Sequence, residues 1–403
     1  MAALIPLSPL AAQHAGHGAP AAGGDTTASV HAMVQAMPLL TRAAPGPGGE
    51  ARTEVAFAQT IVMTRATWWR GRATLDATLD AEGVTMRRGE LSLGAFGEGF
   101  VDRRHPHAYL HELVLATVTR AGPVALSAGG GRGFAPFGTD DPMVRPFAKY
   151  PINHHLAQIL ERGLVVGAAR LGPAMVELGT FTGEEPERPS SLPLARRFGD
   201  SWSVRATAIP APWGEVQASH ARVASPERPD GFGLDQRKWS VSARAASRDG
   251  ARYALAEWAR TVERDHLRRA DAFAYESALL EGSIRAGAVG IALRLEQTDR
   301  PEEERDADPF RSARPHTDLS ILGITRWRTA TLHAATPEVT WGTVTGVPFL
   351  ELSRLEAKSR DARALFDPAA FYRSSHFWMV SAGVRVRAGM PHARMGRYGV
   401  AVP

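Results

Sequence analysis

The sequence predicts an all-β fold, a single antiparallel transmembrane β-barrel of about 14 strands, with 12 to 16 allowed. Three observations predict it. From about residue 160 onward, apolar and polar residues alternate in segments of roughly ten residues. The arginines in the clearest segments keep to the polar parity. The connections between segments are tight turns in some places and longer charged loops in others.

The alternation gives each strand one apolar face and one polar face. In the segment 200–209, Trp202 and Val204 share one parity, whereas Ser203 and Arg205 share the other. The same pattern recurs in 237–248, 287–298 and 375–388. A cation on the lipid face of a barrel costs roughly 2–4 kcal/mol near the bilayer midplane, so this parity is typical of a wall between lipid and water.

The N-terminal part of the chain does not show this pattern. Residues 1–13 resemble the end of a signal peptide, with an apolar stretch followed by small residues, although the usual basic start is missing. Residues 14–52 are rich in Ala, Gly, Pro and His and contain several Met, which predicts a flexible lead segment. Within it, Val30, Met33, Val34 and Met37 have the spacing of a short helix.

The barrel is expected to span residues 53–389, followed by a short tail at 390–403. Its candidate strands are 54–64, 69–80, 109–119, 123–130, 162–170, 174–182, 200–209, 213–224, 237–248, 251–263, 272–284, 287–298, 318–329, 343–355 and 375–388. Their number is odd, whereas bacterial barrels have an even number of strands. One candidate is therefore spurious or one strand has been missed.

Two kinds of connection join the candidate strands. Gly172-Pro173, Arg248-Asp249-Gly250 and Arg285-Ala286-Gly287 predict tight turns. The loops at 183–199, 225–236, 264–271 and 299–317 are longer and charged. Short turns at one end and long loops at the other are typical of an outer-membrane barrel.

Residues 131–160 interrupt the strand pattern with a long segment rich in aromatic and charged residues. An irregular segment of this length is usually functional. Either it folds inward and narrows a pore, or it is a disordered outer loop. Its candidate constriction residues are Asp140, Asp141, Arg145 and Lys149.

Composition excludes several classes of protein. Hydrophobic residues make up 44% of the 403 residues, and no apolar run reaches the roughly 18 residues of a membrane helix. Cysteine is absent, so disulfides and thiolate metal sites are excluded. The net charge of +5 comes from arginines spread along strand faces, with no basic block for nucleic acid. The distribution instead favours a mildly anion-selective lumen, with these candidate pore-lining residues: Arg205, Arg244, Arg294, Glu296, Arg385 and Arg387.

Histidines supply two candidate metal sites. His105 and His107 lie two residues apart near His111, so they would share one face of a strand. His14 and His17, with nearby methionines, would form a second site for copper or zinc. The alternative for the first group is hydrogen bonding within a turn at the barrel mouth.

The sequence contains no catalytic constellation. We find no nucleophile elbow, phosphate loop, His-Glu-x-x-His motif or dinucleotide fingerprint. The prediction is therefore that the protein is not an enzyme and needs no cofactor, although scattered polar residues could build a site in a barrel enzyme.

Four motifs resemble an uncharacterised family of porin-like outer-membrane proteins from Gram-negative bacteria. They are Val101-Asp-Arg-Arg-His-Pro-His107, Pro151-Ile-Asn-His-His155, Val176-Glu-Leu-Gly-Thr-Phe-Thr-Gly-Glu-Glu-Pro186 and Val384-Arg-Val-Arg-Ala-Gly389. They follow the family's order over roughly residues 90–390. The resemblance implies a barrel in the bacterial outer membrane, and more weakly a link to metal handling.

Three functional hypotheses follow. The first is a porin-like barrel that passes small polar or anionic solutes, with outer-membrane lipid and the barrel-assembly machinery as partners. The second is a copper- or zinc-associated accessory protein of the outer membrane, and the third is a barrel enzyme. The sequence leaves the solute and the oligomeric state open.

Overall fold

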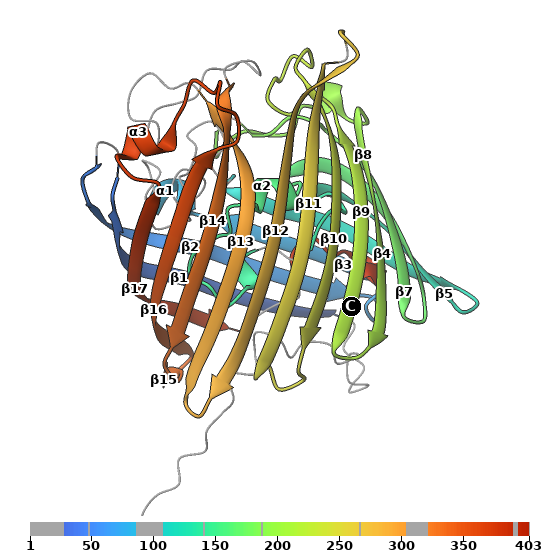
Figure 1. Cartoon of the computed structure of the whole chain (residues 1–403). Helices are drawn as coiled ribbons and strands as arrows, with labels where there is room; N and C mark the ends of the chain where they lie inside the picture. The colour runs from blue at the N-terminus through green and yellow to red at the C-terminus, as the bar shows by residue number, and fades with distance from the viewer. Residues whose placement is uncertain are drawn as a thin grey trace, which may run out of the picture.

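The computed structural model describes residues 28–46, 49–85, 108–139, 142–186, 188–265, 267–303, 321–389 and 394–402. It is built almost entirely from antiparallel strands (Figure 1). The strands are β1 (Ala28–Ala44), β2 (Arg52–Trp68), β3 (Ala73–Asp80), β4 (Leu110–Ala121), β5 (Val124–Gly133), β6 (Arg162–Leu171), β7 (Ala174–Phe181), β8 (Ser201–Ala211), β9 (Gly214–Val223), β10 (Asp235–Ala246), β11 (Arg252–Asp265), β12 (Ala270–Ala286), β13 (Val289–Glu303), β14 (Ile321–Ala335), β15 (Val339–Trp341), β16 (Val344–Ser359) and β17 (His376–Gly389).

The sheet closes on itself. Each strand of the ring pairs with the next ring strand along the chain, and β1 pairs with both β2 and β17. At the closure, Met33 lies opposite Gly389 and Ala44 lies opposite Trp378. β15 pairs with β16 beyond the ring, because β14 pairs directly with β16. Among the described residues, the closed ring therefore has 16 strands, not about 14.

The ring strand missing from the sequence prediction is β1, and the short β15 outside the ring was not predicted either. β1 lies within the segment 14–52, which was expected to be a flexible lead with a short helix, and both expectations are wrong for residues 28–44. The reason is that its inward face is mixed, because Gln35 and Thr41 share it with apolar residues. Met33, Met37 and Leu39 point inward and are buried against residues that fold into the barrel. Because apolar and polar residues do not alternate here, the spacing of Val30, Met33, Val34 and Met37 resembles that of a helix.

The alternation itself is confirmed in the other strands. In β8, Ser203, Arg205 and Thr207 are buried on the inner face, whereas Trp202 is 44% exposed on the outer face. Val241 in β10 is likewise exposed, between buried Ser240 and Ser242. The wall is therefore apolar outside and polar inside.

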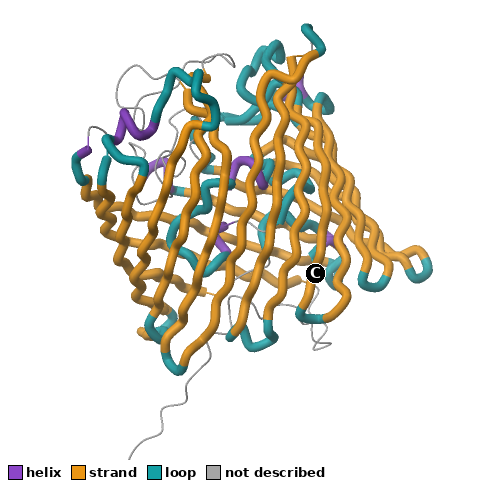
Figure 2. Tube along the Cα trace, viewed as in Figure 1, coloured by secondary structure: helices purple, strands orange, loops and turns teal. Residues whose placement is uncertain are grey.

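The two ends of the barrel differ. Connections such as 122–123, 172–173, 212–213 and 287–288 are two-residue turns at the lower end of Figure 1. The connections 134–161, 182–200, 224–234 and 360–375 are long, and α3 (Pro368–Tyr372) lies among those at the upper end. Figure 2 shows the same asymmetry, with loop segments also inside the ring of strands. The predicted asymmetry of the connections is confirmed, but the predicted long loop 264–271 is wrong, because β11 extends to Asp265 and β12 begins at Ala270.

Helices are few and short in the part of the chain that the structure describes. They are α1 (Glu82–Thr85), α2 (His154–Ala157), α3 and the 3-10 turns Pro142–Val144, Ala195–Arg197 and Gly399–Ala401. The side chain of Asp367 caps α3 by accepting a hydrogen bond from the backbone N–H of Ala369 at 3.0 Å. Across the described residues, none of the helices has the length and apolarity needed to cross a membrane.

Candidate pore constriction

The connection between β5 and β6 folds into the barrel, and we call residues 134–161 the inner loop. Its aromatic residues Phe134, Phe137 and Phe147 are all at most 5% exposed. It carries α2, which lies inside the ring of strands in Figure 1. Of the two alternatives for this segment, the inward fold is correct. Asp140 and Asp141 lie outside the described residues.

Backbone amides of the inner loop are held by carboxylates on the far wall. The N–H of Ala148 donates to Glu351 at 2.8 Å, and the N–H of Ile152 donates to Glu296 at 2.9 Å. The side-chain amide of Asn153 donates to Glu257 at 2.7 Å. These acceptors come from β16, β13 and β11, so the loop crosses the lumen from β5 to the opposite wall.

Charged side chains add to this attachment. Lys149 Nζ lies 3.0 Å from Glu351, and Arg145 lies 3.3 Å from Glu281 and 3.8 Å from Glu257. All five side chains are buried. Charge-assisted hydrogen bonds of this kind are stronger than neutral ones, and breaking one buried partner leaves an uncompensated charge.

Arg294 of β13 completes the attachment. Its Nε donates to Glu281 at 2.7 Å and its Nη1 donates to the carbonyl of Lys149 at 2.8 Å. Its guanidinium carbon also lies 4.1 Å from the centre of the Phe147 ring, within the range of a cation–π contact. One wall residue thus holds both the backbone and an aromatic side chain of the inner loop.

The described tail, residues 394–402, enters the lumen as a second element. Arg397 is 1% exposed and lies against β7, β8 and β9. Its Nη1 donates to Glu177 at 3.2 Å and Thr207 at 3.1 Å, and its Nη2 donates to Glu215 at 3.0 Å and Gln217 at 2.8 Å. Burial lowers the pKa of Arg397, whereas the two carboxylates raise it, and the guanidinium stays charged at neutral pH.

The tail and the inner loop contact each other. The backbone N–H of Phe134 donates to the hydroxyl of Tyr398 at 2.9 Å. Gly396 has a φ of +73°, and a Cβ at this position would lie 2.8 Å from the Phe134 ring. Arg205 bridges the two elements, because its guanidinium donates to the carbonyls of Gly138 at 3.2 Å and Gly396 at 2.8 Å.

The predicted pore-lining residues all lie on the inner parity. Arg205, Arg294, Glu296, Arg385 and Arg387 are less than 10% exposed because loop or wall groups cover them. Arg385 Nη2 donates to the carbonyl of Phe147 at 2.9 Å, and Arg387 contacts Glu338 and Thr345. Arg244 is half-buried, with its guanidinium 5.6 Å from the Tyr253 ring.

Four wall carboxylates are absent from the candidate site residues of the sequence: Glu177, Glu215, Glu281 and Glu351. Each lies on the inner parity of its strand, which is a usable signal, but no partner is visible within the same segment. No local pattern predicts that the tail enters the barrel.

Of the candidate metal ligands, His111 is the one that lies within the described residues, and its side chain already has a partner. The Nδ1 of His111 lies 2.6 Å from Glu161 Oε1, and the His111 ring meets Phe134 edge-on at 4.9 Å. His105, His107, His14 and His17 lie outside the described residues. Among the residues described, no group of three or more His, Asp or Glu side chains could hold a metal ion.

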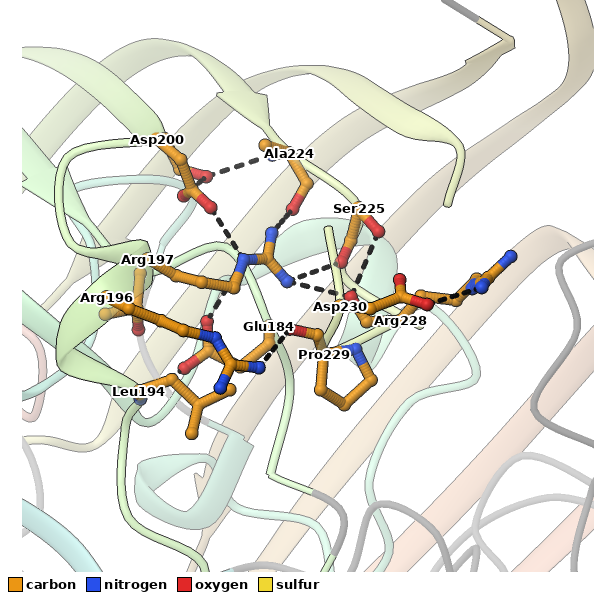
Figure 3. Close-up of polar contacts among 12 residues, drawn as sticks. Glu184, Leu194, Arg196, Arg197, Asp200, Ala224, Ser225, Arg228, Pro229 and Asp230 are labelled. Carbon is orange, nitrogen blue, oxygen red and sulfur yellow. Dashed lines mark hydrogen bonds and ion pairs between the residues drawn. The ribbon is translucent and has the colours of Figure 1, made fainter. Parts of the chain in front are cut away.

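At the long-loop end, Arg197 joins two connections (Figure 3). It extends from the loop 182–200 and donates to the carbonyls of Ala224, Ser225 at 3.0 Å and Arg228 at 2.9 Å in the loop 224–234. Its Nε donates to Asp200 at 2.8 Å. One buried guanidinium therefore satisfies three carbonyl groups of a neighbouring loop.

We expect Arg197→Ala to destabilise the packing of these two loops by about 1–3 kcal/mol, because it removes the charged donor that the carbonyls of Ala224, Ser225 and Arg228 share. Limited proteolysis of the folded barrel should show new cuts within 182–200 or 224–234. Arg196→Ala is the matched control, because Arg196 is exposed and donates to Pro229 alone at 3.2 Å among the described residues. Equal cutting of the two variants would contradict the role of Arg197.

A closed 16-stranded antiparallel barrel, apolar outside and polar inside, with an inward-folded loop after β5, has the fold of the porin class of outer-membrane barrels. No protein-family model and no curated protein matches the sequence. Solved structures do match. An anion-selective porin from Comamonas acidovorans is 12% identical, with a TM-score of 0.53 over 90% of this chain and 99% of that one.

Two structures of OmpT, an outer membrane protein of Vibrio cholerae, also match. A loop-deletion mutant is 9% identical with a TM-score of 0.51, and the in-vitro folded trimer form is 8% identical with a TM-score of 0.50. Each match covers 90% of this chain and 99% of the other. At these identities the likeness concerns the fold alone.

Proposed function

We propose that the protein is a porin-like channel of the bacterial outer membrane that passes small polar or anionic solutes. The observation that carries this proposal is the polar inner wall of a closed barrel with an inner loop held across its lumen. A solute would pass through the space that the inner loop and the tail leave. The exposed apolar outer residues, such as Val241 and Trp202, support contact with lipid.

Planar-bilayer recording of the refolded barrel tests the proposal. Folding is first verified by heat-modifiable mobility on a gel. We expect discrete conductance steps. In a salt gradient, the reversal potential should shift toward the equilibrium potential of the anion. A folded barrel that inserts into the bilayer but carries no current would contradict the proposal.

The proposed contact with lipid can be tested separately at the centre of β10. We expect Val241→Arg to destabilise the barrel in vesicles by about 2–4 kcal/mol, because the cation would face hydrocarbon. Urea titration of folding into lipid vesicles measures this change. Val241→Leu is the matched control and should fold as the parent does. An arginine variant as stable as the leucine variant would place this face away from lipid.

A further inference from the structure

A small cavity of about 90 Å³ lies on the inner face of the barrel near the short-turn end. Such a volume holds several water molecules or one small anionic group. Its floor is made of the small residues Gly290, Ala292 and Ala335 on β13 and β14. Arg285 of β12 lines one side, and Arg385 and Arg387 of β17 line the other. Pro146 of the inner loop also borders it.

The register of the sheet explains this grouping. Arg285 lies opposite Gly290, Gly290 lies opposite Ala335, and Ala335 lies opposite Phe349 on β16. On the next pair of strands, Val347 lies opposite Arg385. Gly290 and Ala335 leave room on β13 and β14 that larger side chains would fill, and Val347 and Phe349 of β16 line the cavity next to Arg385.

The three arginines differ in their partners. Arg387 is neutralised by Glu338 and also donates to Thr345 at 3.1 Å. Arg385 is 7% exposed and donates to the carbonyls of Phe147 at 2.9 Å and Pro146 at 3.5 Å. Within the described residues, no carboxylate lies within ion-pairing distance of Arg385, and its Nε is buried without a hydrogen-bond partner.

Arg285 adds a second positive charge to the cavity, and this charge acts on the exposed carboxylate of Asp249 in the adjoining turn. Its guanidinium makes no hydrogen bond and no ion pair with any of the residues that the structure describes, and it is partly exposed. Arg385 is the buried one of the two, and a buried cation without an ion pair is unfavourable unless an anion or water compensates it. The fork of a guanidinium matches the oxygens of a carboxylate or a phosphate.

We propose that this cavity, which we call the mouth site, binds a small soluble oxyanion, a carboxylate or a phosphate group, between Arg285 and Arg385. The inference rests on the proposed function for its physiological meaning, since the site would lie on the route of a solute at the short-turn end. A bound anion would also affect the attachment of the inner loop, because Arg385 donates to the carbonyls of Pro146 and Phe147. Binding itself requires no current through the barrel.

Isothermal titration calorimetry of the refolded barrel in low-salt buffer tests the mouth site, with inorganic phosphate and acetate titrated separately. We expect saturable binding of at least one of them by the parent protein. Arg285→Gln and Arg385→Gln should each weaken that binding about tenfold, because each removes a charged donor. Low salt is needed because ionic screening weakens exposed charges.

Arg120→Gln is the matched control. Arg120 lies at the same end of the barrel, near the end of β4 on another part of the wall, and it does not line the cavity. This variant loses the same charge and should bind within about twofold of the parent, because a distant charge contributes little across water. Arg285→Gln should fold normally, since the guanidinium that it removes makes no hydrogen bond or ion pair within the described residues. Heat-modifiable mobility verifies the folding of every variant.

The outcomes separate this inference from the proposed function. Absence of saturable binding by the parent, an unchanged affinity in Arg285→Gln, or an equal loss in Arg120→Gln would overturn the mouth site. A barrel that binds phosphate or acetate but carries no current keeps the mouth site and loses the channel. A barrel that conducts but binds neither phosphate nor acetate keeps the channel and loses the mouth site.

Discussion

Removing residues 394–403 is expected to raise the single-channel conductance of the refolded barrel about twofold or more, because the tail occupies part of the lumen cross-section. The described tail residues are buried between the wall and the inner loop, with Met395 and Tyr398 both at most 3% exposed. Water would replace them and would solvate Glu177 and Glu215 once Arg397 is gone. The current would then flow through a wider polar passage.

A point substitution separates the volume of the tail from its attachment. Arg397→Gln keeps the chain length but removes the charge that lies between Glu177 and Glu215. We expect intermediate conductance with more frequent switching between levels, because the tail would detach reversibly. Arg222→Gln serves as the control, since Arg222 pairs with Asp235 at 2.7 Å on an exposed part of β9. Conductance that is unchanged by both the deletion and Arg397→Gln would mean that the tail does not limit the pore.

Replacing Glu351 by alanine is expected to release the inner loop from the far wall. Glu351 is fully buried and accepts hydrogen bonds from the backbone of Ala148 at 2.8 Å, from Lys149 at 3.0 Å and from His333 at 3.0 Å. Its loss leaves Lys149 as a buried cation without its carboxylate, which typically costs about 3–5 kcal/mol. Guanidinium unfolding in detergent measures this loss of stability.

The same variant should also change the current. A loop freed at Ala148 and Lys149 would move in and out of the passage, so we expect noisier single-channel records and new proteolytic cuts within 142–161. Glu356→Ala is the matched control on the same strand. Its side chain is only partly buried, on the outer parity, and pairs with Lys358. If Glu351→Ala matched this control in stability and in the noise of its single-channel records, Glu351 would not hold the loop.

The wall of the barrel could be predicted from the sequence because its rule is local. On β8, β10, β13 and β17 the residue at each position meets either the outside or the lumen, and neighbouring residues alternate between the two. All fifteen candidate strands match strands of the ring. Their odd number indicated that one strand was missing, and that strand is β1. β1 was missed because Met33, Met37 and Leu39 face the apolar side of the inner loop, so both of its faces carry apolar residues.

The contents of the lumen could not be predicted in the same way. Arginines were placed correctly on the inner parity, yet their role as attachments depends on distant partners. Arg397 reaches Glu177 across 220 positions of sequence, and Lys149 reaches Glu351 across 202. Glu257 of β11 likewise accepts a hydrogen bond from Asn153 of the inner loop, 104 positions away. No local pattern relates such pairs.

The sequence by itself therefore determined a β-barrel wall with an apolar outside, a polar inside and two unequal ends, because side-chain parity and turn chemistry act between near neighbours. The tertiary structure alone decided that the first strand closes the ring and that the inner loop and the tail share the lumen. It also decided that Arg285 and Arg385 line the mouth site without forming an ion pair within the described residues. These features depend on which groups meet once the ring has closed, and that is settled by the three-dimensional register of the whole sheet.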